Sequence, residues 1–399
     1  MLHPYRVMIV DDSAVIRGLL ARTLEAEPDI SVVTTASDGR MAVNALGRYD
    51  VEVIVLDIEM PVMDGLTALP LLIEAKPGVQ VIVASTLTRR GADISLQALA
   101  AGAADYLTKP TASALSAAAD FRRDLVAKVR ALASARRGTT HEPAPAPAPP
   151  PAATAARNGS AAAASPAVGR SGTAARSGAP ALRPGTAPAR ERAPLVLRPA
   201  AAAVAPEVLA IGSSTGGPQA LFTLLGALRN GGLNHLPILV TQHMPATFTT
   251  ILAEHIGRAT GWPAAEAVDG EPVRPGRVYI APGDFHMVVA QNGAARTLRL
   301  NKEAPENFCR PSVDPMLRSI AQSYGRHALC AILTGMGHDG LGGGRAIIAA
   351  GGTMIAQDEA TSVVWGMPGA VATAGLCSAV LPLPEIAPYI RRVALRSAA

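Results

Sequence analysis

The chain has 399 residues, of which 49% are hydrophobic and 3% aromatic, and it carries a net charge of +5 at pH 7. This apolar content allows more than one core, and the length suggests two or three domains, of which the sequence supports two. The low aromatic content argues against a protein that stacks single-stranded nucleic acid. The charge excess is weak evidence for a nucleic-acid partner, because many of the arginines lie scattered through the middle of the chain.

Cysteine use and hydropathy favour a cytoplasmic protein. Cys309, Cys330 and Cys377 are too few and too scattered for a disulfide framework or a metal cage, so each is interpreted as a small buried apolar residue in a reducing compartment. No apolar run approaches the length of a membrane span, and the first one, at residues 7–10, ends at two aspartates. We therefore expect no secretory segment and no direct membrane insertion.

Short apolar runs alternate with helical patterns over about residues 4–135, which is typical of a doubly wound parallel sheet. Such a sheet gathers its chemistry at the carboxyl ends of its strands. The runs lie at residues 6–10, 30–34, 53–56, 81–84 and 105–107.

Three carboxylates follow these runs: Asp11 and Asp12 come after the first, and Asp57 comes after the third. Held together they would repel one another, so the cluster indicates a hard cation, and oxygen ligands of this kind suit Mg²⁺. Lys109 follows the fifth run, where it would meet an added anion.

This segment resembles a response-regulator receiver domain, which has a flavodoxin-like fold. The resemblance rests on Val-Asp-Asp-Ser at 10–13, Leu-Asp-Ile-Glu-Met-Pro-Val-Met-Asp-Gly at 56–65, Ser-Thr at 85–86 and Tyr-Leu-Thr-Lys-Pro at 106–110. It implies that Asp57 accepts a phosphoryl group from a histidine kinase. It also implies a Mg²⁺ site made by Asp12, Asp57 and the backbone carbonyl of Glu59, with Asp11 acting through water.

Three switch residues follow from the same resemblance. Lys109 would pair with the phosphate, Ser85 would move its hydroxyl toward the acyl phosphate, and Tyr106 would change rotamer. Thr86 is an alternative to Ser85.

From residue 136 to about 203 the composition shifts to Ala, Pro, Gly, Ser and Arg without apolar periodicity. Such a segment cannot bury enough surface to offset its ordering entropy, so we expect a disordered tether. Its arginines could attract an acidic partner, but a solvated spacer is the better interpretation. The tether would let the flanking domains dock and undock.

The C-terminal segment opens with an apolar run at 208–211 and a Gly-Ser-Ser-Thr-Gly-Gly-Pro turn before a helical pattern. Gly212, Ser214 and Gly216 form a Gly-x-Ser-x-Gly pattern, whose small residues leave room for an exposed hydroxyl. Ser214 is therefore a candidate nucleophile, although Ser213 competes for the role and the pattern also occurs in simple Gly-rich turns. The helix start beyond it offers unpaired N–H groups to a developing oxyanion.

Further strands are expected at 238–241, 278–281, 328–334 and 353–356, with a hairpin around Asn292-Gly293 that joins residues 287–290 to 297–300. His243 follows the second strand of this segment and Asp339 follows the fourth. A nucleophile, a general base and an orienting carboxylate would thus meet at the carboxyl edge of the sheet. The order Ser, His, Asp differs from that of α/β-hydrolases, and Asp339 could instead be the N-cap of the following helix.

Residues 206–392 resemble the catalytic domain of the chemotaxis glutamate methylesterases, the CheB family. The matching stretches are Ile-Gly-Ser-Ser-Thr-Gly-Gly-Pro at 211–218, Thr-Gln-His-Met-Pro at 241–245, Tyr-Ile-Ala-Pro-Gly-Asp at 279–284, Arg-Pro-Ser-Val-Asp-Pro at 310–315 and Leu-Thr-Gly-Met-Gly-His-Asp-Gly at 333–340. The resemblance implies a triad of Ser214, His243 and Asp339, with backbone N–H groups near Thr215 and Met336 as oxyanion donors. Two residues depart from the family pattern: Ser213, where alanine is common, and His338, where asparagine is common.

The resemblance also implies an activity and its partners. The expected reaction is phosphorylation-activated hydrolysis of glutamyl methyl esters on the cytoplasmic domains of chemoreceptors, with deamidation of glutamines as a second reaction. No cofactor is expected in the hydrolase domain. The predicted class is α/β, with a receiver domain at 1–135, a linker at 136–203 and a larger Rossmann-like catalytic domain at 204–399, both domains being doubly wound parallel sheets.

Three residues between the predicted strands form a polar cluster: Arg310, Ser312 and Asp314. Ser312 and Asp314 could themselves be catalytic, but a wall of the substrate cleft or a structural turn is the preferred interpretation.

Two other function classes compete with the esterase. The stretch from Gly335 to Gly340 fits Gly-x-Gly-x-x-Gly and would suit a dinucleotide-binding oxidoreductase, but Asp339 would stand where the pyrophosphate approaches the helix. A phosphorylation-controlled binding module without activity is the other alternative, and the complete triad argues against it. No short helix-turn-helix segment stands out to indicate DNA binding.

Overall fold

The structure of the protein is a computed structural model that describes residues 3–109, 115–139, 195–199, 204–229, 231–293 and 295–395, without the side chains of residues 115–120 and 139. The predicted tether lies mainly outside the described residues. Within these ranges, no helix is both long enough and apolar enough to cross a membrane.

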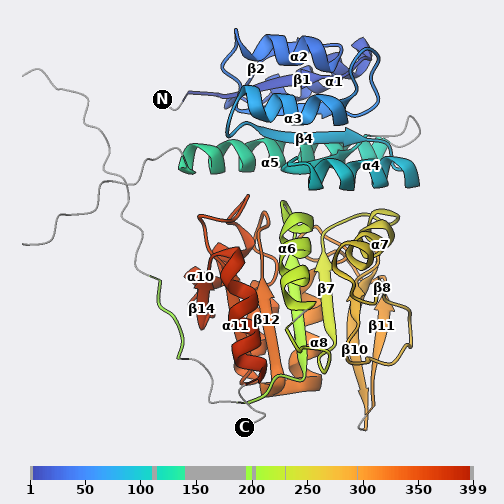
Figure 1. Cartoon of the computed structure of the whole chain (residues 1–399), viewed down its shortest axis with the longest axis vertical. Helices are drawn as coiled ribbons and strands as arrows, with labels where there is room; N and C mark the ends of the chain where they lie inside the picture. Colours follow the sequence, from blue (N-terminus) through green and yellow to red (C-terminus); the bar gives the residue numbers. More distant parts are fainter. Residues whose placement is uncertain are drawn as a thin grey trace, which may run out of the picture. The chain divides into compact units, whose positions relative to one another are not determined.

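The N-terminal part, drawn in blue to teal in Figure 1, contains a five-stranded parallel sheet whose strand order is β2-β1-β3-β4-β5, which confirms the predicted doubly wound arrangement. Serine, aspartate or threonine side chains at the first four helix starts accept hydrogen bonds from the first turn and fix where each helix begins. The elements are β1 (Tyr5–Val10), α1 (Ala14–Glu25), β2 (Ile30–Ala36), α2 (Gly39–Leu46), β3 (Val53–Asp57), α3 (Gly65–Ala75), β4 (Gln80–Ser85), α4 (Arg89–Ala100), β5 (Asp105–Thr108) and α5 (Leu115–Thr139).

The C-terminal part contains a seven-stranded parallel sheet in the order β14-β13-β12-β6-β7-β9-β8 and a separate antiparallel hairpin, β10 with β11. The expected strands and the hairpin at Asn292-Gly293 are confirmed. The elements are β6 (Val208–Ser213), α6 (Gly217–Arg229), β7 (Ile238–Gln242), α7 (Phe248–Thr260), β8 (Ala264–Glu266), β9 (Val278–Ile280), β10 (His286–Asn292), β11 (Ala295–Asn301), α8 (Val313–Tyr324), η1 (Gly325–His327), β12 (Ala328–Ile332), α9 (Leu341–Ala349), β13 (Thr353–Gln357), α10 (Met367–Thr373), β14 (Ala379–Leu381) and α11 (Leu383–Leu395).

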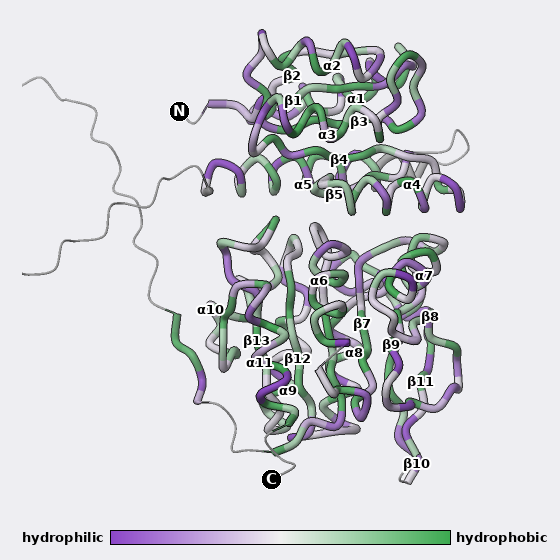
Figure 2. The backbone as a smooth tube through the Cα atoms, viewed as in Figure 1, coloured by the Kyte–Doolittle hydropathy of each residue, from purple (hydrophilic) through white to green (hydrophobic). Residues whose placement is uncertain are grey.

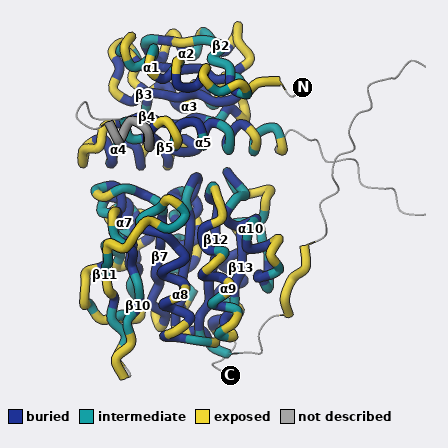
Figure 3. The backbone as a smooth tube through the Cα atoms, turned by 180° about the vertical axis from the view of Figure 1, so that it is seen from behind, coloured by how far each residue is buried: buried dark blue, intermediate teal, exposed yellow. Residues whose placement is uncertain are grey.

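Alternate residues of the central strand β6 supply the two faces of this larger sheet. Leu209 and Ile211 pack with α6, α7 and α11, whereas Val208 and Ala210 pack with α8, α9, α10 and the hairpin. Burial on both faces requires strands that are mainly apolar, and β12 and β7 are buried along their whole length, with the polar residues of β7 at its carboxyl end (Figures 2 and 3). β6 lies between β12 and β7, so the segments that leave these three strands meet at one edge of the sheet.

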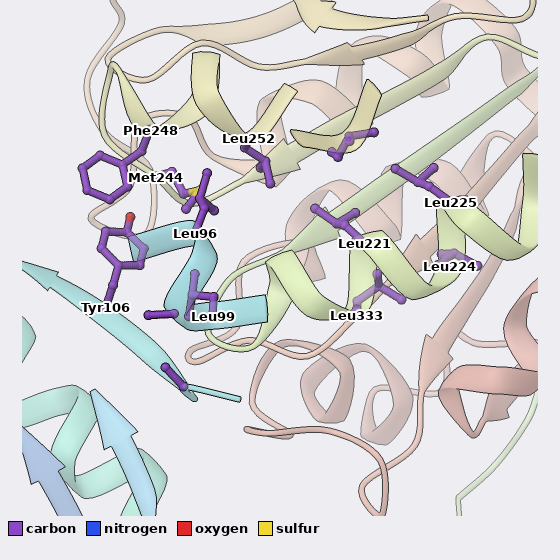
Figure 4. Close-up of a cluster of buried hydrophobic side chains, with 14 of the residues drawn as sticks. Leu96, Leu99, Tyr106, Leu221, Leu224, Leu225, Met244, Phe248, Leu252 and Leu333 are labelled. Atoms are coloured by element: carbon purple, nitrogen blue, oxygen red, sulfur yellow. The ribbon is translucent and has the colours of Figure 1, made fainter. Parts of the chain in front are cut away.

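Both sheets belong to one compact unit, and side chains from both meet in a common apolar cluster (Figure 4). The ring of Tyr106 stacks on Phe248 of α7, with the ring centroids 4.7 Å apart. Leu96 and Leu99 of α4 and Met244, Leu252 and Leu221 of the larger sheet's domain belong to the same cluster. Hydrophobic burial therefore holds this face of the N-terminal domain against the C-terminal domain.

Candidate active site

Ser214 lies in a tight turn between β6 and α6 that is tied to both neighbouring strand ends. Its backbone N–H donates to the carbonyl of Thr334 over 3.0 Å, and its carbonyl accepts from Gln242 over 2.9 Å. Gly216 has φ +74°, and a Cβ there would lie 2.5 Å from the side chain of Val363. Only glycine adopts this positive φ without strain and has no Cβ that would clash with Val363. The backbone path therefore requires a glycine at position 216.

The two neighbouring serines have different surroundings. Ser213 is fully buried, and its hydroxyl donates to Gln242 Oε1 over 2.6 Å. Ser214 is partly exposed. Of the two serines, only Ser214 is therefore not fully buried.

His243 Nε2 lies 2.7 Å from Asp339 Oδ2, which pairs two of the residues predicted for the triad. Asp339 is 1% exposed, and its carboxylate accepts the backbone N–H groups of Val313 and Asp314 at the start of α8 over 2.6 and 3.0 Å. It also accepts the Ser312 hydroxyl over 2.8 Å. Burial alone would raise the pKa of Asp339, but the hydrogen bonds from His243 and from the backbone outweigh it and lower the pKa to about 2. The carboxylate is thus held ionised.

The other ring nitrogen of His243 faces a cysteine. Nδ1 lies 3.4 Å from Cys309 Sγ, and within the described residues no hydrogen bond joins His243 to Ser214. Burial would lower the pKa of His243, but the contact with Cys309 and the hydrogen bond to the Asp339 carboxylate outweigh it, so the pKa is raised. The Cys309 thiol therefore contacts the ring nitrogen that would have to accept the proton of a serine nucleophile.

Two residues beside the triad were not singled out for it from the sequence. Cys330 and Cys377 are buried, as expected, but Cys309 is only partly buried and contacts His243, which corrects its interpretation as a buried apolar residue. Asn307 donates from Nδ2 to Asp339 Oδ1 over 3.0 Å and to Asp314 Oδ2 over 3.1 Å. Their one signal in the sequence is that they directly precede the Arg-Pro-Ser-Val-Asp motif.

The predicted polar cluster divides into two environments. Ser312 is 0% and Asp314 7% exposed, so neither is a cleft wall; the structural interpretation fits them instead. Asp314 accepts the backbone N–H groups of Gly340 and Gly343 over 3.1 and 2.6 Å and so caps α9. Asp339 caps α8 rather than the helix that follows it. Arg310 pairs with Asp284 over 2.5 Å at the surface.

Thr215 and Met336 are the predicted oxyanion donors; Thr215 directly follows Ser214, and Met336 follows Gly335, where an added Cβ would lie 2.9 Å from the Ser214 Cβ. In the described part of the chain, neither backbone N–H donates to a protein acceptor. Unpaired N–H groups beside a serine hydroxyl suit an oxyanion. His338, the second departure from the family pattern, is exposed.

The side chains of Asp11, Asp12 and Asp57 offer oxygen atoms that all lie within 4.8 Å of one another. Such hard donors fit a divalent cation like Mg²⁺, so this cluster could hold one. Lys109 Nζ lies 2.7 Å from Asp11 Oδ2 and 2.8 Å from Asp57 Oδ1. Burial raises the pKa of Asp57 despite Lys109. A pocket lined by Glu59, Ser85, Thr86 and other residues adjoins Asp57.

The predicted switch residues connect this pocket to the domain contact. Ser85 is buried and shares a hydrogen bond of 2.7 Å with Ser95, whereas Thr86 is exposed. Tyr106 is the residue that stacks on Phe248. Its neighbour Asp105 accepts the Thr215 hydroxyl over 2.6 Å. Thr215, the residue that β5 contacts, therefore directly follows Ser214.

An α/β domain with a carboxylate pocket, joined to an α/β domain with Ser, His and Asp at neighbouring strand ends, defines a receiver-linked hydrolase as the class. The family model of the CheB methylesterase matches residues 209–390, and that of the response regulator receiver domain matches residues 7–120. The chain belongs to the CheB methylesterase family.

Relatives match almost the whole chain. It is 57% identical to protein-glutamate methylesterase/protein-glutamine glutaminase 1 of Paramagnetospirillum magneticum, over 98% of this chain and 96% of the relative. It is 56% identical to protein-glutamate methylesterase/protein-glutamine glutaminase of group 2 operon of Rhodospirillum centenum, over 99% of this chain and 95% of the relative. The crystal structure of the Thermotoga maritima CheB methylesterase catalytic domain shares 40% identity over 48% of this chain and 100% of that one, with a TM-score of 0.46.

Proposed function

We propose that the C-terminal domain hydrolyses γ-glutamyl methyl esters on chemoreceptor cytoplasmic domains and deamidates glutamines at the same site. The relatives carry the names of both activities. The observation that carries the proposal is the partly exposed Ser214 at the end of β6, with the hydrogen-bonded His243 and Asp339 following the neighbouring strands β7 and β12.

The reaction needs His243 Nδ1 to exchange its contact with Cys309 for one with Ser214. His243 then takes the Ser214 proton as the oxygen attacks the ester carbonyl, and the Thr215 and Met336 N–H groups bind the oxyanion. The proton passes to the leaving methoxide, which departs as methanol. Water, deprotonated by His243, hydrolyses the acyl-enzyme and restores Ser214. With a glutamine, ammonia leaves in place of methanol.

Asp339 fixes the ring orientation of His243 and stabilises the imidazolium. The buried, ionised state of its carboxylate suits that role. The dinucleotide alternative has no support here, because this carboxylate stands inside the Gly-x-Gly-x-x-Gly stretch and is already used by α8 and His243.

The N-terminal domain is proposed as the regulator, with domain limits of about 1–135, 136–203 and 204–399. Asp57 would accept phosphate from a histidine kinase. Mg²⁺ would be held by Asp12, Asp57 and the Glu59 carbonyl, with Asp11 acting through water, and would neutralise the charge of the transferred group. Lys109 would pair with the phosphate. We place the protein in the cytoplasm, where kinase and receptor domains are accessible.

The contact of Asp105 with Thr215 supports an inhibitory role for the unphosphorylated receiver. Thr215 lies beside Ser214 and supplies one proposed oxyanion donor, so a receiver bound there covers the turn. Phosphorylation would shift the population toward an undocked form through Ser85 and Tyr106, the latter being part of the contact itself.

The direct experiment is methanol release from methylated receptor cytoplasmic fragments, with and without a small-molecule phosphodonor plus Mg²⁺. Release that rises with the phosphodonor supports the esterase and its control. Methanol release that does not change with the phosphodonor would support the esterase activity but contradict its regulation by phosphorylation. No release would favour the alternative of a binding module without activity.

Asp105→Ala should raise the rate of methanol release by the unphosphorylated protein. Losing the charge-assisted hydrogen bond with Thr215 weakens docking by about 1–2 kcal/mol, which allows a rise of roughly 5–30-fold, and the ion pair of Asp105 with Lys128 inside the receiver is lost as well. The same assay without phosphodonor measures it, and the further stimulation by phosphodonor should shrink accordingly. Asp50→Ala, which removes a carboxylate that pairs with Lys76 and Arg6, is the control. An unchanged basal rate in Asp105→Ala would contradict the inhibitory contact.

The pH profile should report His243. The base must be neutral to act, and its raised pKa places the acid limb of kcat/KM above the ordinary value of about 6.5, so activity is lost as pH falls through the raised pKa. Cys309→Ala removes one cause of that rise and should move the limb to lower pH. A small activated ester assayed from acid to alkaline pH tests this, with the buried Cys377→Ala as control. An acid limb of kcat/KM that does not move in Cys309→Ala, or that moves to higher pH, would refute this prediction.

A further inference from the structure

The four residues from Glu306 to Cys309 form a tight turn with two central residues. Glu306 and Cys309 exchange both backbone hydrogen bonds, of 3.1 and 2.9 Å. The central residues Asn307 and Phe308 have φ of 52° and 64°. Two successive positive φ values are those of a type I′ turn. Asparagine adopts this region readily, but it is strained for a bulky aromatic residue.

The turn is held against the triad on each side of Phe308. Asn307 donates to Asp339 Oδ1 over 3.0 Å, and Cys309 Sγ lies 3.4 Å from His243 Nδ1. The backbone of Phe308 is therefore fixed relative to both triad members by its two immediate neighbours.

The Phe308 ring is largely exposed and lies at the contact with the receiver domain. It is 83% exposed, the highest value among the large apolar side chains that the structure describes. The guanidinium of Arg123, from α5 of the receiver domain, lies over its face at 5.3 Å from the centroid. The exposed ring is not part of the core, and residues held in a strained backbone conformation cluster at active sites and ligand clamps.

We propose that Phe308 is a specificity residue of the esterase, whose ring packs on apolar side chains of the receptor segment that carries the methylated glutamate. This proposal rests on the proposed function. Packing there would fix the segment one residue away from the contacts with His243 and Asp339 and so hold the ester within reach of Ser214. Small esters lack such a segment and gain nothing from the ring. Arg123 covers the same face, so a docked receiver competes with the substrate for Phe308.

Three variants of the full-length protein test this, assayed with phosphodonor and Mg²⁺. Phe308→Asn removes the ring and places a residue suited to positive φ; Phe308→Leu keeps an apolar side chain. Val268→Ala truncates another exposed apolar residue, 61% exposed, as the matched control. The readouts are KM and kcat for methanol release from methylated receptor fragments, the hydrolysis rate of a small activated ester, and Tm.

For Phe308→Asn we expect KM for the receptor fragment to rise about 10-fold, as for loss of an aromatic interface anchor, with kcat and the small-ester rate within about twofold of wild type. Tm should rise by about 2 °C as the backbone strain is relieved. Phe308→Leu should recover much of the KM, and Val268→Ala should match wild type.

An unchanged KM in Phe308→Asn would overturn the proposal. An equal loss of small-ester hydrolysis would also overturn it, because Phe308 would then only support the triad. A lower Tm would show that the ring stabilises the turn and would remove the argument from strain. Failure of the wild type to release methanol would instead overturn the proposed function. The wild type is measured before the variants, so this failure is distinguished from failure of the proposal for Phe308.

Discussion

Replacing Ser214 by alanine is expected to lower methanol release from methylated receptor fragments by roughly 10⁴-fold or more. Loss of the nucleophile removes the covalent route and leaves only the contributions of binding and of the oxyanion donors, which is the pattern seen when a triad serine is deleted. Folding should be unaffected, because the hydroxyl of Ser214 makes no hydrogen bond within the described residues. Deamidation of receptor glutamines should fall with the esterase, since one nucleophile serves both reactions.

The matched control for this variant is Ser213→Ala. Ser213 is fully buried and its hydroxyl donates only to Gln242, so its removal should cost a few-fold in rate at most, together with a small loss of stability. If Ser213→Ala abolished activity and Ser214→Ala retained it, the nucleophile would be assigned to the wrong neighbour.

Asp339→Asn is expected to reduce kcat/KM by about 10³ to 10⁴-fold. An amide in this position cannot stabilise the imidazolium, and its NH₂ group favours the wrong tautomer of His243. The variant should also be less stable, because an amide oxygen replaces two carboxylate oxygens that accept the N–H groups of Val313 and Asp314 and the Ser312 hydroxyl.

The size and pH dependence of that stability loss follow from the lowered pKa of Asp339, about 2. A depressed carboxyl pKa contributes stability that is present above the unfolded value of about 3.9 and is lost as pH falls toward 2, which amounts to about 2–3 kcal/mol at neutral pH. Denaturant unfolding of wild type and variant at pH 7 measures it. Asp269→Asn, at an exposed ion pair with Arg299, should change neither stability nor rate appreciably. Wild-type activity in Asp339→Asn would rule out the orienting role.

Most of the fold could be predicted from the sequence because buried parallel strands are continuous apolar runs. The two strands that were missed, β8 (Ala264–Glu266) and β14 (Ala379–Leu381), have three residues each and lie at the sheet edges, so they carry too little pattern to recognise.

The residues of the candidate site fall into two groups. Ser214, His243 and Asp339 follow strands that are neighbours in the sheet, and the topological rule for parallel sheets brings such positions together. Cys309 and Asn307 lie in a loop, and their contacts with His243 and Asp339 depend on tertiary packing that periodicity does not encode. The same is true of the hydrogen bond between Asp105 and Thr215, which joins segments far apart in the chain.

The identity of the nucleophile is the central claim, and covalent labelling of the full-length protein tests it most directly. The protein, treated with phosphodonor and Mg²⁺, is reacted with a fluorophosphonate, and the modified peptide is fragmented in a mass spectrometer. The account predicts one adduct per chain, on Ser214, formed by Ser213→Ala and Cys309→Ala but not by Ser214→Ala. An adduct on Ser213 or Cys309, or an unmodified Ser214 in a protein that releases methanol, would contradict it.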